Sequence, residues 1–176
     1  FDASNNAVGG MVSGAGNAIL SNSIFSNGAL AIDLGNDEVT ANDAGDGDAG
    51  ANNLQNFPDI VSARLGSNGS LAVRYSVDSA TANSTYPLRI EFFEADSAAS
   101  GEGKTFLGSD SYQASSAQSA RSAIIVNAAS LGAGDGDVVV ATATDANGNT
   151  SEFSQDVEVT AVATAIPGLT QWGLIA

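Results

Sequence analysis

The sequence contains no cysteine and no histidine among its 176 residues. Without cysteine, neither disulfide bonds nor thiolate metal sites can stabilise the fold. Because both residue types are missing, Ser-His-Asp and Cys-His catalytic groups cannot form, and zinc and copper lack their usual ligands. These absences exclude the common nucleophilic hydrolases and the commonest transition-metal centres.

Basic residues are also scarce: five Lys and Arg stand against 20 acidic residues, giving a formal net charge of −15. The first 63 residues carry eight acidic groups and no basic one. Such a surface repels phosphate backbones and anionic membranes, so we expect no nucleic-acid binding. We expect no membrane insertion of this segment either, because no stretch of the sequence is long and apolar enough to span a bilayer. The acidic surface attracts divalent cations, or it simply keeps an exported protein soluble, and both interpretations remain open.

Aromatic residues make up only 6% of the chain, although hydrophobic residues reach 43%. Much of the apolar content is alanine, and 20 glycines accompany few long helix-forming residues. A chain of this length can bury a core, and its composition favours short strands and turns over helices. The sequence therefore predicts an all-β fold.

Residues 1–35 contain short apolar stretches at 18–20, 23–25 and 29–32, which are separated by predicted turns that contain asparagine. This spacing is too short for helices and too regular for a loop, and it predicts a solenoid of stacked short strands. About two coils fit into the segment, and two coils cannot close a hydrophobic core alone. The segment is therefore predicted to be one end of a longer stack, or to stack on a second copy.

From residue 59 the pattern changes to alternating apolar and polar side chains, as in half-buried antiparallel strands. Short strands at roughly ten-residue spacing, each bounded by turn residues, predict a β-sandwich. The expected strands cover residues 60–65, 70–77, 88–94, 105–107, 122–126, 138–144 and 155–162.

Several stretches carry a resemblance to a known family. Residues 6–10 and 14–22 resemble the repeats of bacterial extracellular surface proteins that fold as right-handed parallel β-helices, and 32–58 resembles their closing segment. The stretches 90–93, 101–108 and 143–154 look like the sandwich module that often follows. The resemblance implies a short right-handed parallel β-helix stub over 1–58, an antiparallel Ig-like β-sandwich over 59–160, and an extracellular or cell-surface location.

The C-terminal residues 161–176 form an apolar tail. Within it, 166–175 is similar to the Ile-Pro-Thr-Leu type of C-terminal sorting motif in exported bacterial proteins, with Gly168 where threonine is usual. The alternative is a final strand followed by an apolar plug.

Residues 36–58 form a long Asp/Asn/Gly segment, in which Asp43, Asp46 and Asp48 fall within six residues. Calcium requires six to eight hard oxygen ligands in a flexible cage, and such a segment supplies them. An ion would also offset the repulsion between crowded carboxylates. The alternative is a solvated acidic turn without an ion. The predicted calcium ligands are Asp37, Asp43, Asp46, Asp48 and Asn52.

These observations predict a non-enzymatic structural protein of the cell surface, an extracellular matrix or a self-assembling filament, with calcium as a stabilising ion. Its expected partners are other copies in head-to-tail contact, or an upstream β-helix. Two other functions remain open: a calcium-dependent module that binds surface glycans, and a fragment of a polysaccharide-cleaving enzyme. The latter is disfavoured because no lysine or arginine that could accept a proton precedes Arg64.

Overall fold

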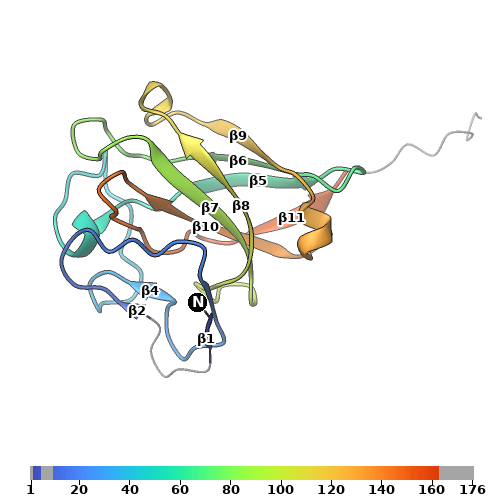
Figure 1. The fold of residues 1–176 in the computed structure, drawn as a ribbon, viewed down its shortest axis with the longest axis horizontal. Helices are drawn as coiled ribbons and strands as arrows, with labels where there is room; N and C mark the ends of the chain where they lie inside the picture. Colours follow the sequence, from blue (N-terminus) through green and yellow to red (C-terminus); the bar gives the residue numbers. More distant parts are fainter. Residues whose placement is uncertain (1, 5–9, 163–176) are drawn as a thin grey trace, which may run out of the picture.

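The computed structural model describes residues 2–4 and 10–162 of the chain. In this part of the chain most of the ordered elements are strands, and the helices are three short 3-10 turns (Figure 1). Among the described residues no helix is both long and apolar enough to cross a membrane. The elements are β1 (Asp2–Ser4), β2 (Gly10–Met11), β3 (Ser23–Phe25), β4 (Ile32–Asp33), η1 (Ala51–Leu54), β5 (Asp59–Leu65), β6 (Leu71–Ser76), β7 (Leu88–Ala95), β8 (Gly103–Tyr112), η2 (Ala114–Ser116), β9 (Arg121–Ile125), η3 (Ala128–Leu131), β10 (Val138–Thr144) and β11 (Val157–Ala161).

Nine of these strands form one mixed sheet in the order β1-β3-β8-β7-β10-β11-β5-β6-β9. The sheet curls, so that β5, β6 and β9 lie behind β7, β8 and β10 in Figure 1. One hydrophobic cluster fills the space between the two layers, with Leu71, Val73 and Tyr75 of β6 fully buried. Tyr75 contacts Phe92 of the opposite layer edge-to-face, with ring centroids 5.4 Å apart. The predicted all-β fold is confirmed.

Each of the seven strands expected between residues 60 and 162 is present, six of them within two residues of the expected bounds. The strand expected at 105–107 is much longer, because β8 spans Gly103–Tyr112. The sandwich is not purely antiparallel, however, because β11 runs parallel to β5, with Val159 opposite Ala63. β11 also pairs antiparallel with β10, so it joins the two layers into one continuous sheet. Period-2 alternation locates strands along the chain but does not encode which neighbours they take, which explains this departure from the predicted arrangement.

The N-terminal strands pair in parallel. β1 pairs with β3, with Asp2 opposite Ser23, and β2 pairs with β4, with Gly10 opposite Ile32. β3 joins the main sheet through an antiparallel contact between Ile24 and Gly103 of β8. Pairs of two or three residues do not establish a parallel β-helix, so the predicted stub remains a prediction.

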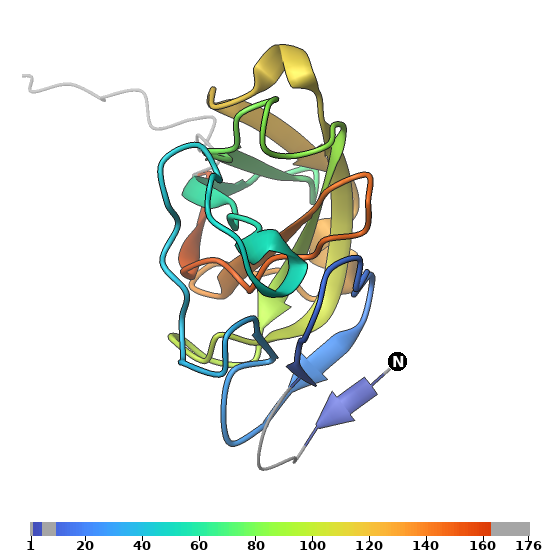
Figure 2. The same cartoon turned by 90° about the vertical axis from the view of Figure 1, so that its left-hand side faces the viewer.

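A second hydrophobic cluster connects this N-terminal segment to the outer face of the sandwich. Ile24, Ile32 and Leu34 pack there with Phe93 of β7 and Phe153. Figures 1 and 2 show β1 to β4 gathered on one side of the curled sheet, against its lower end in both views. The predicted segment boundary at residue 58 thus falls between two parts that share buried side chains, and most of the predicted tail 161–176 lies outside the described residues.

Buried acceptors from the sandwich hold the irregular N-terminal backbone in place. Glu91 of β7 accepts hydrogen bonds from the backbone N–H and the hydroxyl of Ser21. Glu152 accepts from the backbone N–H groups of Leu34 and Thr40, each at 2.9 Å. These carboxylates provide partners for backbone donors that no sheet ladder satisfies.

Candidate cation site

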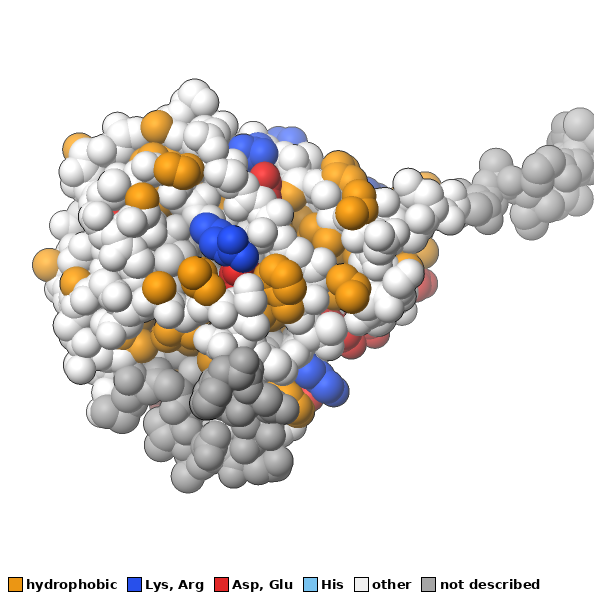
Figure 3. Space-filling view, in the orientation of Figure 1, with side chains coloured by type: hydrophobic (Ala, Val, Ile, Leu, Met, Phe, Trp, Pro, Cys, Tyr) orange, Lys and Arg blue, Asp and Glu red, His pale blue; other side chains and the backbone are white. Residues whose placement is uncertain are grey.

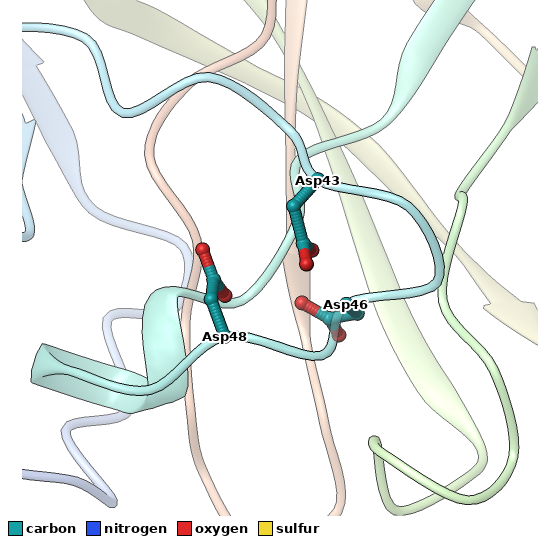
Figure 4. A group of neighbouring side chains, drawn as sticks. All are labelled: Asp43, Asp46 and Asp48. Carbon is teal, nitrogen blue, oxygen red and sulfur yellow. The ribbon is translucent and has the colours of Figure 1, made fainter.

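The carboxylates of Asp43, Asp46 and Asp48 converge in the loop between β4 and η1 (Figure 4). One oxygen from each lies within 4.8 Å of the others. A tight turn brings them together, because Gly45 and Asp46 both adopt left-handed backbone conformations, with φ of 77° and 63°. Glycine takes this conformation without steric cost, and aspartate is among the residues that tolerate it best. We call residues 36–58 the acidic loop.

Asp46 is the buried member of the group, with 6% of its surface exposed. Its Oδ1 accepts a hydrogen bond from the backbone N–H of Asn56 at 2.8 Å. Its Oδ2 accepts from Gln55 at 2.6 Å and from the hydroxyls of Ser79 and Ser84. A buried charge with this many donors is well compensated, so Asp46 organises the loop whether or not an ion is bound.

Amide side chains fix the rest of the loop against β5 and β6. The side chain of Asn56 accepts from the N–H of Asp43 and donates to the carbonyls of Asp43 and Asp78. Asn42 pairs with Phe57 in the same way, accepting from its N–H and donating to its carbonyl. An asparagine side chain can donate to the carbonyl and accept from the N–H of one backbone residue, as a neighbouring strand does. Such contacts order this long segment with little regular secondary structure.

Asp48 is the exposed member of the group, and its pKa reflects the crowding of the three carboxylates. Its pKa is raised above the ordinary aspartate value, first by partial burial and then by the neighbouring charges of Asp43 and Asp46. A hydrogen bond from its own backbone amide opposes the shift. The carboxylates of Asp43 and Asp46 thus favour the uncharged form of Asp48, and a cation placed between the three would reverse that preference.

A polar cavity of about 190 Å³ opens beside the three aspartates. Carboxylate, amide and hydroxyl oxygens surround it, which are the ligand types that hard cations such as Ca²⁺ prefer. Several of these groups come from elements far along the chain, in the β6–β7 connection and the turn after β10. The lining residues are Asp46, Gly47, Asp48, Asn53, Gln55, Ala82, Asn83, Ser84 and Asp145.

The other two predicted ligands lie elsewhere in the contact network. Asn52 is fully buried, and its Oδ1 accepts from the backbone N–H of Asn17 at 2.9 Å. Its Nδ2 donates to the carbonyls of Asn17 and Thr150, so the side chain ties three segments together. Asp37 is exposed in a turn, next to Gly35, and is not one of the three converging carboxylates.

Sequence reasoning did not identify Gln55, Ser79, Ser84 and Asp145 as neighbours of the aspartates. Only Gln55 lay within the acidic loop. The serines follow a predicted strand, and Asp145 belongs to a turn sequence with the Asn147-Gly148 signal. Nothing in their local sequence indicates that the fold brings them to the acidic loop.

No protein-family model matches this chain, and no curated protein matches it. Among solved structures, the chain is similar to the adhesin domain of Epf from Streptococcus pyogenes, with 12% identity and a TM-score of 0.41. The matched region covers 64% of this chain and 35% of that one, so this chain spans about a third of the length of that structure. The fold itself defines the class of protein, an all-β molecule with a curled mixed sheet.

Proposed function

We propose that this chain is a non-enzymatic structural module of an extracellular surface or matrix, built to end a stack of parallel coils. The parallel pairing of β1 with β3 and of β2 with β4 carries the proposal. Asp2 lies opposite Ser23 and Gly10 opposite Ile32, so the chain returns to the same position after 21 or 22 residues. Two successive passes with this repeat are the stacking unit of a parallel solenoid.

β1 is the terminal strand of the main sheet, and β2 ends the two-stranded one. In the described part of the chain each has one strand partner, so one side of its backbone is open to a further strand. Open strand edges pair readily with another chain. In this proposal, the strand that pairs with each open edge belongs to a further coil of the same kind, either from a second copy or from preceding chain.

Proline substitution in β1 tests this proposal on the chain itself. Successive N–H groups of a strand point to opposite sides, so one of Ala3→Pro and Ser4→Pro removes an N–H from the open edge and the other removes one from the β3 side. We expect the wild-type chain to form elongated particles in negative-stain images and to gain mass with concentration in light scattering. The edge-directed variant should remain folded and should lose the elongated particles that coil stacking produces. A wild-type chain that stays monomeric at high concentration, with or without calcium, contradicts assembly through this edge.

We further propose that Ca²⁺ binds between Asp43, Asp46 and Asp48. The convergent carboxylates, the oxygen-lined cavity and the raised pKa of Asp48 support this assignment. Calorimetric titration of the chain with CaCl₂ should show one binding event, and thermal unfolding should occur at higher temperature in calcium than in EDTA.

Asp48→Asn provides the discriminating variant for the calcium site, because Asp48 is exposed and the change removes charge with little change in shape. In EDTA the variant should be slightly more stable than wild type, since repulsion is relieved. In calcium the order should reverse, because the ion loses a ligand. Glu158→Gln, an exposed charge on β11, should show neither effect. Equal unfolding temperatures for the wild type in calcium and EDTA would refute the site.

A further inference from the structure

The outer face of the β5–β6–β9 layer carries two of the five basic side chains of this acidic molecule, Arg64 and Arg74. Of the five basic side chains, three form ion pairs: Arg89 with Glu91, Lys104 with Asp96, and Arg121 with Asp110. Figure 3 shows the opposite side of the molecule, where basic and acidic side chains lie next to one another and uncharged surface surrounds them. Arg64 and Arg74 form no ion pair with any described residue.

Strand register places these two arginines together. In β5, Ala63 is buried and Arg64 is exposed, and in β6, Val73 is buried and Arg74 is exposed, so both arginines point away from the core. Arg64 lies opposite Ala72, and Arg74 lies opposite Ser62. The arginines are therefore diagonal neighbours on adjacent strands, whose Cα atoms are about 7–8 Å apart in a regular sheet.

The side chains directly opposite the arginines on the neighbouring strands are uncharged, and the nearby Ile124 is apolar. Ser122 lies opposite Arg74 and Ile124 opposite Ala72 on β9, which is the last strand of the sheet. Ile124 leaves 63% of its surface exposed. Three carboxylates lie at the margin of this face: Asp59 is opposite Ser76, Glu158 precedes Val159, which pairs with Ala63, and Asp135 accepts a hydrogen bond from the backbone N–H of Ala161. We call Ser62, Arg64, Ala72, Arg74, Ser122 and Ile124 the arginine face.

We infer that the arginine face binds the acidic loop of a second copy of this chain. The loop offers exposed Asp37 and Asp48 in a segment that contains no basic residue. Neither Asp37 nor Asp48 forms an ion pair with a basic side chain of the described residues. Guanidinium groups pair with carboxylates in bidentate geometry, and exposed aliphatic groups beside them exclude water from the contact.

The arginine face and the acidic loop are two different surfaces of the molecule, which makes the contact head-to-tail. β5 starts at Asp59, directly after the acidic loop, and Arg64 lies near its far end. Arg64 is five residues beyond Asp59 in this strand, which corresponds to a distance of about 17 Å. A contact between two different surfaces does not close on itself in a pair, so it can extend into an open row of copies. This contact goes beyond the coil stacking proposed at β1 and β2, and it uses neither strand.

Sedimentation velocity of the full chain in EDTA, at fixed physiological salt, tests the contact. EDTA keeps divalent cations away from the acidic loop, and the edge-directed proline variant of β1 serves as background so that coil stacking does not contribute. We expect association that increases with concentration. Arg64→Gln/Arg74→Gln should weaken it at least about tenfold, whereas Arg64→Lys/Arg74→Lys, which keeps the charge, should retain part of it.

A mixing experiment identifies the occupant. Asp37→Lys/Asp48→Lys removes the acidic partner but keeps the arginine face, so it should not associate alone. Mixed with Arg64→Gln/Arg74→Gln, it should form a discrete one-to-one pair, because only one complementary contact remains. Association of the glutamine variant at wild-type strength, or no pair on mixing, would overturn the inference. Binding of polygalacturonate by the arginine face without self-association would overturn it as well, by showing an anionic glycan as the occupant.

Discussion

At the residue scale, this molecule uses buried carboxylates and amides as fixed acceptors for irregular backbone. Glu91, Glu152 and Asp46 are each almost fully buried, and each accepts at least two hydrogen bonds from segments that belong to no ladder. Burying a carboxylate is costly unless its oxygens are satisfied. These side chains therefore fix particular loop conformations, and their removal would leave buried donors without partners.

Asn52 gives a direct test of this role against the role of a calcium ligand. Asn52→Ala removes the hydrogen bonds to Asn17 and Thr150, and we expect a loss of about 1–3 kcal/mol in the free energy of unfolding. Urea titrations of wild type and variant, in calcium and in EDTA, measure it. If Asn52 only ties segments together, the loss is equal under both conditions. A loss confined to calcium would make Asn52 a ligand.

At the scale of elements, the strands of the sandwich were predictable and their partners were not. Alternation such as Leu71-Ala72-Val73-Arg74-Tyr75 directly encodes one buried face, and β6 buries that face. The parallel pairing of β11 with β5 depends on residues about a hundred positions apart, and local sequence carries no signal for it. The candidate cation site shows the same division, because its aspartates are close in sequence whereas tertiary structure brings Ser84 and Asp145 to them.

The junction between β3 and β8 depends on the absence of a side chain at Gly103. A Cβ atom there would lie 2.5 Å from the ring of Phe153 and 3.0 Å from that of Phe93. These rings stack edge-to-face with centroids 5.3 Å apart, within the cluster that also buries Ile24. The N-terminal segment is therefore attached through a tightly packed contact.

Gly103→Ala should displace these rings and destabilise the fold by about 1–3 kcal/mol. We expect the effect to concentrate in the N-terminal segment, because Ile24 pairs with Gly103. Hydrogen exchange should show faster exchange at residues 23–34 with little change in β5 and β6. Ser109→Ala, at an exposed position of the same strand, is the control. Uniform acceleration throughout the sandwich would show that the two parts unfold as one unit.

At the scale of the whole molecule, an excess of acidic groups sets the dependence of stability on pH. The pKa of Glu152 is raised, mainly by burial and despite hydrogen bonds from Leu34 and Thr40, and the nearby charge of Asp33 adds to the shift. Burial also raises the pKa of Asp59, with a further contribution from Asp78, and Asp48 shifts in the same direction. Asp96 shifts oppositely, mainly through its hydrogen bond from Ser26.

A raised acid pKa means that the folded state binds protons more tightly than the unfolded chain. The stability from Glu152, Asp48 and Asp59 is fully present below their ordinary values of 4.5 and 3.8, and it is lost as the pH rises through their folded values. Repulsion within a chain of net charge −15 acts in the same direction. We therefore expect the free energy of unfolding to be larger in mildly acidic solution than at neutral pH.

Urea titrations between mildly acidic and neutral pH, in EDTA and low salt, measure this slope. Asp48→Asn should flatten it, gaining on the order of 0.5 kcal/mol at neutral pH and nothing below the ordinary aspartate pKa, since Asp48 is largely solvated. Added salt should raise the neutral-pH stability of the wild type by screening repulsion, and it should have less effect in acid. Stability that instead rises toward neutral pH would mean that the hydrogen-bonded carboxylates, with Asp96 among them, outweigh the crowded ones.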